Sequence, residues 1–405
     1  MPKKITFTVP KIPKSTRRLL VLAVIVVVGV GGFLLGDNVG NGNLVFSGSG
    51  QTGLPAHLNY SSVNQVYQAL RANYDGKLTE QQILNGIKHG LANAPGDPYT
   101  EYFTPSQAKS FSNELNNTFS GIGAEVAANA KGEIEIISPI AGSPAAKAGL
   151  KPQDIVTAVN GVSTANQSVD TVVNEIRGKA GSKVTLGVLR NGSPLKITIT
   201  RQNIVVPSVN TKILKGNIGY MQITTFANDT SSLANKAAQT FKSDHVKGII
   251  LDLRNDPGGL LTAAINVSSL WLPRGQLIMQ EKRGSVVEQS YYSTGNDLLH
   301  GIPTVVLING GSASASEITT GALHDHHDAY VIGTKSFGKG VVQQLINFSN
   351  GSELKVTIAS WYRPDGQDIE HIGITPDKTV KLTTQDIKSG VDAQLNAAIS
   401  YINSH

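Results

Sequence analysis

Cysteine is absent from the 405 residues, so the chain can neither build a disulfide scaffold nor use thiol chemistry. The body of the protein also lacks an excess of charge. The formal net charge is +6, six basic residues precede Leu19, and the other 29 basic residues equal the 29 acidic ones. Because the basic excess is confined to the first 18 residues, we do not predict a nucleic-acid-binding surface.

An uncharged apolar run follows this basic tail, from Leu19 to Gly36. Its length is close to that of a helix that crosses a bilayer. A secretory signal peptide has a similar pattern, but this run is longer than usual for one and is not followed by a small-x-small cleavage site. We therefore expect a basic cytoplasmic tail at 1–18, a transmembrane helix at 19–36, and a single-pass protein of the cell membrane with its body on the extracytoplasmic side.

The segment after the apolar run changes from linker-like to helical composition. Residues 37–58 are rich in Gly, Asn and Ser, which predicts a flexible linker. Apolar residues at helical spacing then predict helices at 63–74 and 79–94, with Thr79 as the N-cap of the second. We assign 59–117 to a small N-terminal helical domain and 386–405 to a C-terminal helical tail.

Short strand-like segments separated by turn signals occupy residues 118–204. Asn160-Gly161 and Asn191-Gly192 are dipeptides typical of tight turns between strands. Helical patterns at 143–149 and 169–179 interrupt the strands. The pattern predicts a compact, partly open β-barrel with two helices.

Residues 205–385 have the pattern of an α/β domain. GIILDL leads through RNDPGG into an apolar helical segment, and TVVLIN leads through GG into SASASEITTGALHD. Continuous apolar strands followed by a glycine turn and a helix predict a parallel or mixed sheet that is covered by helices. The mouth of such a sheet is the usual location of a functional site.

Three serines lie at the start of the second of these helices: Ser312, Ser314 and Ser316. Free backbone N–H groups and the positive end of the helix dipole stabilise an anion at this position. A serine there is suited to acyl transfer if a base lies nearby. Helix capping is the competing role for a serine in this position.

The general base is not specified by the residues alone. His324, the first of three histidines in LHDHHDA, lies ten helical positions after Ser314, or about 15 Å along the axis, which is too far for a hydrogen bond. The same histidines and aspartates could form a metal site, but adjacent helical residues point in different directions. A desolvated lysine can replace histidine as the base, and Lys335 and Lys339 are equal candidates. Position 317 is Glu, so no Ser-x-x-Lys pattern supplies the lysine.

Two motifs in order, NGGSASASEITTGAL and GTKSFGKGVVQ, resemble the catalytic signature of the carboxy-terminal processing, or tail-specific, serine proteases. The resemblance implies that Ser314 is the nucleophile, that Lys339 is its base and that Gln343 orients the lysine. It also implies an oxyanion hole formed by the backbone N–H groups of Gly259 and Ala315. GDPYTEYFTP and GQDIEHIGITPD match the same family, and the resemblance covers about residues 63–380. No metal or organic cofactor is implied.

A second resemblance concerns the predicted β-barrel. SGIGAE and SPAAKAGLKPQDIVTAVNG are similar to the two most recognisable stretches of PDZ domains. In that family, the backbone N–H groups of a glycine-rich loop bind a terminal carboxylate while the peptide adds as a strand. The resemblance assigns this loop to Gly121, Ile122 and Gly123. A tight turn is the alternative reason for these glycines.

Two positions depart from the pattern of the protease family. Asp328-Ala329 stands where a basic residue followed by Ala is usual, and Gly366-Gln367 stands where Gly-Arg is usual. Neither position is one of the catalytic residues. Contacts that a family arginine would make with substrate or with a regulatory segment are therefore not predicted.

Taken together, the patterns and resemblances predict a multidomain protein: a transmembrane helix, a small helical domain, a PDZ domain, and an α/β protease core related to a ββα-type sheet-and-helix fold. The expected function is that of a membrane-anchored serine endopeptidase. Its partners would be protein or peptide substrates with a free apolar C-terminus, and an oligomer is compatible with the sequence. The alternative is a non-catalytic PDZ adaptor on a protease-like body.

Overall fold

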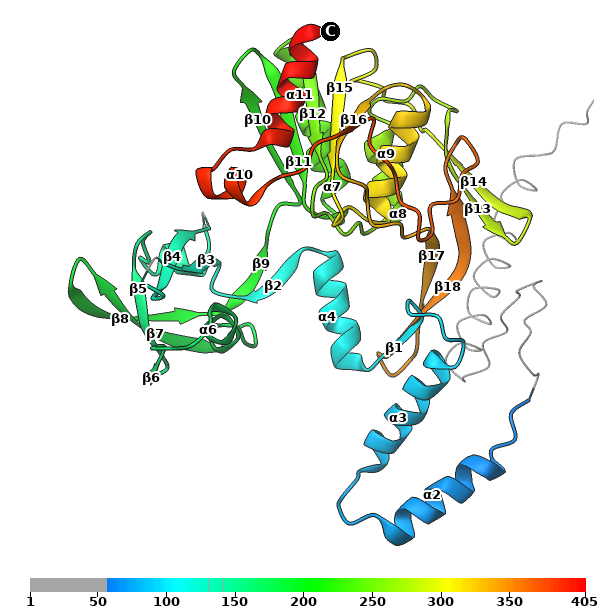
Figure 1. Ribbon diagram of the computed structural model, residues 1–405. Coiled ribbons are helices and arrows are strands. Elements are labelled where there is room, and N and C mark those ends of the chain that lie inside the picture. Colours follow the sequence, from blue (N-terminus) through cyan, green and yellow to red (C-terminus); the bar gives the residue numbers. More distant parts are fainter. Residues whose placement is uncertain (1–56, 130, 141) are drawn as a thin grey trace, which may run out of the picture.

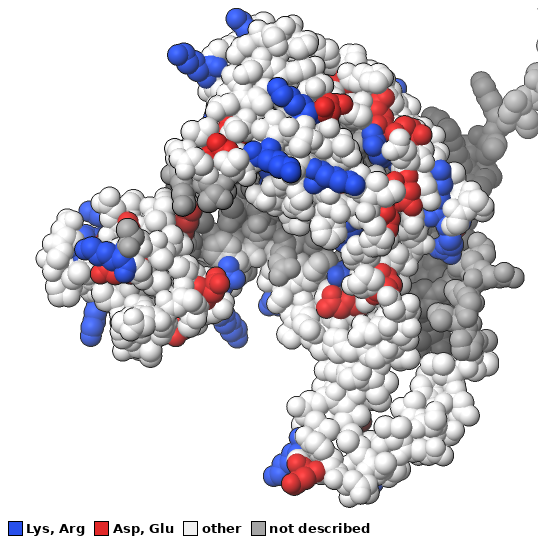
Figure 2. Space-filling view, viewed as in Figure 1, with Lys and Arg blue, Asp and Glu red and all other residues white. Residues whose placement is uncertain are grey.

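The computed structural model describes residues 57–405 except 130 and 141. Its first part is an arm of two helices, α2 (Ser61–Asn73) and α3 (Glu80–Asn93), which extends away from the rest of the molecule (Figure 1). Thr79 is the N-cap of α3, and its side chain and that of Gln82 form a capping box, which confirms the predicted start of this helix. On the face shown in Figure 2, the arm carries few charged side chains.

The prediction of a transmembrane helix is corrected by the structure. Within the part of the chain that the structure describes, no helix has the length and apolar character needed to cross a bilayer. Helices α3 and α7 (Thr230–Ser243) have 14 residues each, whereas a span needs about 20. The apolar run at 19–36 lies outside the described residues. The transmembrane helix of the predicted fold class and the predicted single-pass membrane location are therefore not supported.

A small β-unit follows the helix α4 (Pro105–Leu115). The chain enters it through β2 (Thr118–Gly121) and leaves through β9 (Gln202–Val205), and these two strands pair antiparallel with each other. The strands between them form one sheet of order β3-β4-β5-β7-β8, with β6 paired to β5. Its elements are β3 (Ala124–Ala128), β4 (Ile134–Pro139), α5 (Pro144–Lys147), β5 (Ile155–Val159), β6 (Val162–Ser163), α6 (Val169–Ile176), β7 (Lys183–Arg190) and β8 (Ser193–Thr200).

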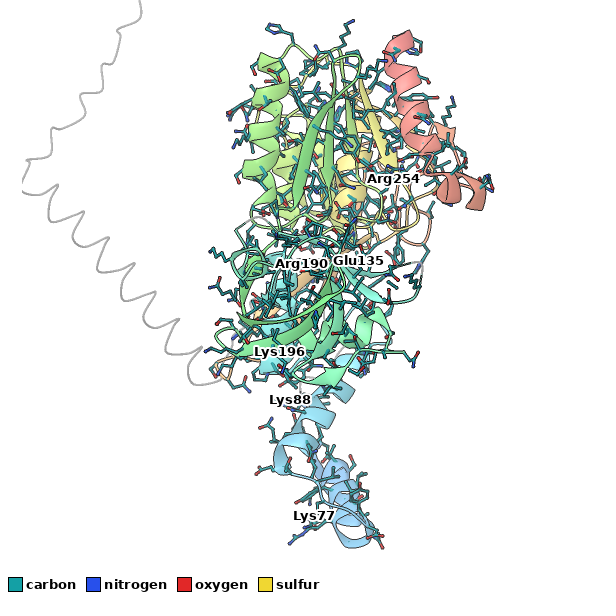
Figure 3. The ribbon with its side chains drawn as sticks, turned by 90° about the vertical axis from the view of Figure 1, so that its left-hand side faces the viewer. Lys77, Lys88, Glu135, Arg190, Lys196 and Arg254 are labelled. Atoms are coloured by element: carbon teal, nitrogen blue, oxygen red, sulfur yellow. The ribbon has the colours of Figure 1, made fainter. Side chains whose placement is uncertain are left out.

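The small β-unit has its own apolar core. Residues of its sheet, such as Ile136 and Leu186, pack with Val172 of α6 and are fully buried. Asn160 and Asn191 both have positive φ and are followed by a positive-φ glycine, which is the geometry that the Asn-Gly dipeptides predicted. Figure 3, in which Glu135 and Arg190 are labelled on this unit, shows it in front of the larger part of the molecule.

The α/β core contains a six-stranded sheet of order β10-β11-β12-β15-β16-β19. Five neighbouring strands of this sheet are parallel: β11, β12, β15, β16 and β19. Strand β10 pairs antiparallel with β11 at the edge, so the predicted mixed sheet is confirmed. The strands are β10 (Val209–Leu214), β11 (Ile218–Ile223), β12 (Gly248–Asp252), β15 (Thr304–Ile308), β16 (Tyr330–Gly333) and β19 (Lys378–Thr379).

Helices cover both faces of this sheet (Figure 1). One apolar cluster joins α7, α8 (Leu261–Ser268) and α9 (Ala315–Asp325) to Ile249, Leu251 and other residues of one face. The other cluster joins α11 (Ala393–Ser404) to Ile250 and neighbours on the opposite face. Successive strand residues alternate between the two clusters, as the period of two in a strand requires. The short helix α10 (Thr384–Ser389) precedes α11.

A second sheet connects the arm to the core. Its order is β1-β18-β13-β14, with β17 also paired to β18. Strand β1 (Glu101–Phe103) comes from the end of the arm and pairs with β18 (Glu353–Tyr362) from the far end of the chain. The other members are β13 (Leu277–Arg283), β14 (Val286–Tyr292) and β17 (Val341–Asn347). Strands β1 and β17 pair with the same residues of β18, Glu353 to Lys355, and therefore lie on its two opposite sides.

Candidate active site

Two glycine-rich turns at the carboxyl ends of β12 and β15 pack directly against each other. In the first turn, Gly258 has φ +96, and a Cβ added to it would lie 2.6 Å from the oxygen of Ala313 and 2.9 Å from the Cβ of Ser314. Only glycine therefore fits at this point of contact. Gly259 is similarly restricted, since a Cβ there would lie 2.3 Å from the oxygen of Phe226.

Two of the three serines in the second turn hold the turns together. The Ser312 hydroxyl donates to the oxygen of Leu253 at 2.7 Å, and the Ser316 hydroxyl donates to the oxygen of Asp256 at 2.9 Å. Both side chains are fully buried. Their hydroxyl groups are thus used to join the β15 turn to the β12 turn.

Ser314 differs from its neighbours in backbone conformation and position. It is the N-cap of α9 and has φ 53 and ψ −114, which a non-glycine residue rarely adopts. Ser314 lines a cavity of about 870 Å³, whereas Ser312 and Ser316 do not. A strained turn that presents a serine at the start of a helix is similar to the turn that presents the nucleophile in α/β-hydrolases.

The backbone N–H groups of Gly259 and Ala315 lie beside this serine. Gly258 precedes the first of them, and a Cβ on Gly258 would lie 2.8 Å from the nitrogen of Ala315. Among the hydrogen bonds of residues 57–405, excluding 130 and 141, neither N–H group donates to a protein acceptor. Both residues line the cavity. Two free donors beside a serine can stabilise an oxyanion.

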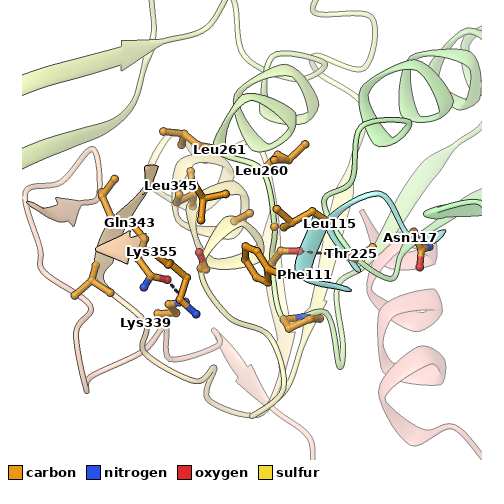
Figure 4. A pocket seen from close by; sticks show the side chains of 18 of the residues that line it. Phe111, Leu115, Asn117, Thr225, Leu260, Leu261, Lys339, Gln343, Leu345 and Lys355 are labelled. Atoms are coloured by element: carbon orange, nitrogen blue, oxygen red, sulfur yellow. Dashed lines mark hydrogen bonds between the residues drawn. The ribbon is translucent and has the colours of Figure 1, made fainter. Parts of the chain in front are cut away.

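Lys339 lines the same cavity, and Lys335 is exposed outside it. The Lys339 ammonium donates to Oε1 of Gln343 at 2.9 Å (Figure 4). It also lies 5.1 Å from the centre of the Tyr99 ring. Burial and the neighbouring charge of Lys355 lower the pKa of Lys339, which favours the neutral amine that a general base requires.

Gln343 connects Lys339 to the end of the arm. Its Nε2 donates to the backbone oxygen of Tyr99 at 2.5 Å. Tyr99 is itself held by Asp97, whose carboxylate accepts the Tyr99 N–H at 3.0 Å. The segment GDPYTEYF, which the sequence connected only by resemblance, therefore accepts a hydrogen bond from the residue that contacts the lysine.

Glu317 is a buried site residue that the sequence analysis did not identify as functional. Its carboxylate accepts the backbone N–H of Ser314 at 2.8 Å, of Gly338 at 2.7 Å and of Lys339 at 3.0 Å. The Ser336 hydroxyl is a fourth donor, at 2.5 Å. The available signal was the S-x-x-E pattern of a capping box at the start of a helix. This carboxylate joins the turn that carries Ser314 to the loop that carries Lys339.

Apolar side chains from several elements form the remainder of the cavity wall (Figure 4). Leu260 and Leu261 follow the β12 turn, Ile318 belongs to α9, and Phe111 and Leu115 come from α4. Phe119 and Arg177 of the small β-unit also line it. The cavity therefore lies where the core, α4 and the small β-unit meet.

The histidines at the C-terminal end of α9 contact other groups. His324 bonds to Asp325 at 3.3 Å and to Asp377 at 3.1 Å, and the Nε2 of His326 bonds to the oxygen of Leu277. In the described part of the chain, no three His, Cys, Asp or Glu residues form a group that could hold a metal ion. None of these histidines lines the cavity that contains Ser314.

The predicted carboxylate-binding loop lies at the start of the small β-unit. Gly121 ends β2, and Ile122 is buried with its oxygen accepting the N–H of Ala145 at 2.8 Å. Gly123 has φ +73, and a Cβ there would lie 2.5 Å from the Cβ of Ser143. Glycine at 123 is thus required for the turn itself. Carboxylate binding by these three residues remains a prediction.

Comparisons with known proteins agree with this division of the chain. A model of peptidase family S41 matches residues 217–380, and a PDZ-domain model matches residues 135–190. The chain is 40% identical over 325 residues to the "Probable CtpA-like serine protease" of Staphylococcus aureus strain MRSA252, which covers 80% of this chain and 65% of that protein. It is 38% identical over 346 residues to the "Carboxy-terminal processing protease CtpA" of Bacillus subtilis strain 168, covering 85% of this chain and 73% of that protein.

The chain spans 65% of the length of the staphylococcal relatives. Among solved structures, an S41 protease from Bacteroides fragilis is similar with a TM-score of 0.57 and 16% identity, covering 87% of this chain and 99% of that one. At this identity the likeness supports the fold alone.

Proposed function

Because this chain belongs to peptidase family S41 and contains a PDZ domain, we propose that it is a serine endopeptidase of the C-terminal processing type, with Ser314 as nucleophile and Lys339 as general base. The residue assignment rests on one observation. Ser314 of the α9 turn, Lys339 of the loop before β17 and the two glycines of the β12 turn all line the same cavity. The other candidates do not line this cavity: Ser312, Ser316 and Lys335.

The first half of the reaction forms an acyl-enzyme. The neutral amine of Lys339 takes the proton from the Ser314 hydroxyl as the oxygen attacks the carbonyl carbon of the scissile peptide bond. The negative charge that develops on the carbonyl oxygen is stabilised by the N–H groups of Gly259 and Ala315, with a contribution of about 3 kcal/mol per donor. The carbon–nitrogen bond then breaks, and the ammonium of Lys339 returns its proton to the leaving amine.

Water completes the cycle. Lys339, again neutral, takes a proton from the attacking water, and the second tetrahedral intermediate releases the carboxylate product and the Ser314 hydroxyl. Gln343 keeps the lysine in place throughout, because its Oε1 accepts from the lysine and its Nε2 is fixed by the oxygen of Tyr99. No step needs a group from outside the chain other than substrate and water.

Substrates are proteins or peptides whose free apolar C-terminus binds to the PDZ domain. The loop at 121–123 accepts the terminal carboxylate, and the peptide adds as a strand to the open sheet. Phe119 and Arg177 support delivery to the active site, because these PDZ-domain residues line the cavity that contains Ser314.

The test combines a serine-reactive probe with an apolar-tailed peptide substrate. The wild-type protein should be labelled at Ser314 and should cleave the peptide, and Ser314→Ala and Lys339→Ala should lose at least about a thousandfold in kcat/KM. Lys335→Ala is the matched control and should retain activity. Wild-type cleavage by Ser314→Ala would contradict the assignment, and an unlabelled, inactive wild type that still binds the tail would favour the non-catalytic PDZ adaptor.

A further inference from the structure

Asp256 is a buried carboxylic acid in the turn that carries Gly259, one of the two proposed oxyanion donors. Its side chain is inaccessible to solvent. Its backbone oxygen accepts the N–H of Ala313 at 3.0 Å and the hydroxyl of Ser316 at 2.9 Å. The residue is therefore clamped between the β12 turn and the turn that presents Ser314. A mechanism that uses Ser314 and Lys339 assigns no role to this carboxyl group.

The carboxyl group has only one partner. Oδ1 accepts the N–H of Gly258 at 2.8 Å, and Oδ2 is buried with no hydrogen-bond partner among the described residues. An ionised carboxylate in that position would leave one charged oxygen without compensation, which costs much more than burying the neutral acid.

The charged groups of the neighbouring elements are all engaged with other partners. Arg254, on the same turn, pairs with Asp252 and with Asp392 at the start of α11. Glu317 of α9 accepts the four donors described above, and Lys339 donates to Gln343. Within residues 57–405, apart from 130 and 141, no cation forms an ion pair with Asp256.

This environment favours the protonated form near neutral pH. Burial raises the pKa of Asp256 to about 8, although the Gly258 N–H and the nearby Ser316 hydroxyl lower it. The direction agrees with the geometry, because desolvation without a positive partner disfavours the charged form of an acid.

The charge state of Asp256 matters because of its neighbours. Gly258, its hydrogen-bond partner, packs against Ser314, and the next residue is Gly259. A negative charge at Asp256 would repel the negative oxygen that forms in the tetrahedral intermediate, because a charge on this fully buried side chain is poorly screened by solvent. An ionised Asp256 would also attract the Gly258 N–H more strongly and thereby shift the turn that orients the N–H of Gly259.

We propose that Asp256 acts as a positioning residue in its neutral form, that it holds the Gly258–Gly259 turn without placing a charge beside the oxyanion, and that its ionisation sets the alkaline limit of catalysis. The proposal rests on the proposed function of Ser314 and its oxyanion hole.

The experiment compares Asp256→Asn with the matched exposed variant Asp244→Asn. We would measure kcat/KM for an apolar-tailed fluorogenic peptide from about pH 6 to 10. Wild type and Asp244→Asn should lose activity above about pH 8, by about tenfold per further pH unit, because each unit lowers the protonated fraction tenfold. Asp256→Asn, a permanently neutral isostere, should lack this fall. The same fall in Asp256→Asn would overturn the proposal.

Unfolding in urea gives a readout that does not depend on activity. Because the folded-state pKa of Asp256 is raised above its unfolded value, the folded form binds the proton more tightly, and the unfolding free energy should decline as pH rises from about 4 to about 8. Asp256→Asn should lack this part of the decline. If Asp256→Asn does not fold, the second neutral variant Asp256→Ser is measured in its place. Failure of both neutral variants to fold would also overturn the proposal.

Labelling by the serine-reactive probe distinguishes a failure of the role proposed for Asp256 from a failure of the proposed function. If Ser314 is labelled and Asp256→Asn keeps the wild-type pH profile, only the role of Asp256 fails. If Ser314 is not labelled in the wild type at any pH, the proposed function fails, and the proposal for Asp256 fails with it.

Discussion

The buried carboxylate of Glu317 accepts the backbone N–H of Lys339 at 3.0 Å, across 22 positions of sequence. The same oxygen, Oε2, accepts the N–H of Ser314 at 2.8 Å. One atom of α9 therefore fixes the backbone of both the serine and the lysine. The relative position of these two residues depends on a side chain that contributes no proton to the proposed reaction.

Glu317→Gln should reduce kcat strongly and leave substrate binding nearly unchanged. An amide has one acceptor oxygen where the carboxylate has two, and its NH₂ group would face N–H donors. Misplacement by about 1 Å can lower the rate by about a hundredfold. Steady-state kinetics would separate kcat from KM, and Glu288→Gln on the exposed hairpin is the matched control. A Glu317→Gln protein with wild-type kcat would contradict the positioning role.

Lys355→Met should move the acidic limb of the activity profile to higher pH. Lys355 lines the cavity and is paired across the sheet with Leu345, two residues from Gln343 on the same face of β17. Its charge is the second cause, after burial, that lowers the pKa of Lys339. Without that charge the pKa of Lys339 should rise, so less neutral base is present at pH 7. The pH dependence of kcat/KM measures the shift.

Lys355→Arg is the control for this prediction, because it keeps the positive charge and should keep the profile of the wild type. An arginine at this position can also pair with Glu101, whose carboxylate lies 3.3 Å from the Lys355 ammonium. A limb that stays in place in Lys355→Met would show that burial alone sets the pKa of Lys339.

Gly258→Ala should abolish activity and destabilise the core by several kcal/mol. The added Cβ would lie 2.6 Å from the oxygen of Ala313, so the two turns would have to separate. Gly301→Ala is the matched control, since Gly301 also has positive φ but open space around it. The control carries only the backbone strain, of about 1 kcal/mol. Equal losses of unfolding free energy in the two variants would contradict the importance of the contact.

His324 should contribute a pH-dependent part of the stability. Its hydrogen bond to Asp325 is the main cause that raises the pKa of His324 above 6.5 in the folded state. A raised histidine pKa stabilises the fold fully below the unfolded value, and the contribution is lost as pH rises through the folded value. Urea unfolding of wild type and His324→Gln should therefore differ more at about pH 5.5 than at pH 8.5. A difference that does not change with pH would contradict this.

The sequence predicted the sheet and its turns because their signals are local. All five residues of β12 are buried, with Ile249, Ile250 and Leu251 at its centre, and the glycines that follow the strand mark the contact with the next turn. The sequence narrowed the candidate nucleophile to three serines and not to one. Ser312 and Ser316 differ from Ser314 because their hydroxyl groups donate to the backbone oxygens of Leu253 and Asp256, which lie on another turn.

The choice between Lys335 and Lys339 needed tertiary structure or a resemblance. Both lysines lie in one glycine-rich loop, and only the fold shows which side chain enters the cavity. The partner of Gln343 could not be predicted either, because the oxygen of Tyr99 is 244 positions away in the sequence. Long-range contacts of this kind leave no periodic signal in a single sequence.

The antiparallel pairing of β2 with β9 places Thr118 opposite Val205, so the two ends of the PDZ domain leave the protease core side by side. Paired Cα atoms in such a ladder are only about 5 Å apart. A cassette with equally close ends could therefore replace the whole PDZ domain without stretching the host chain. In genetic terms, the PDZ domain is a single insertion into the protease core, and a replacement would have to supply cavity-lining side chains in place of Phe119 and Arg177.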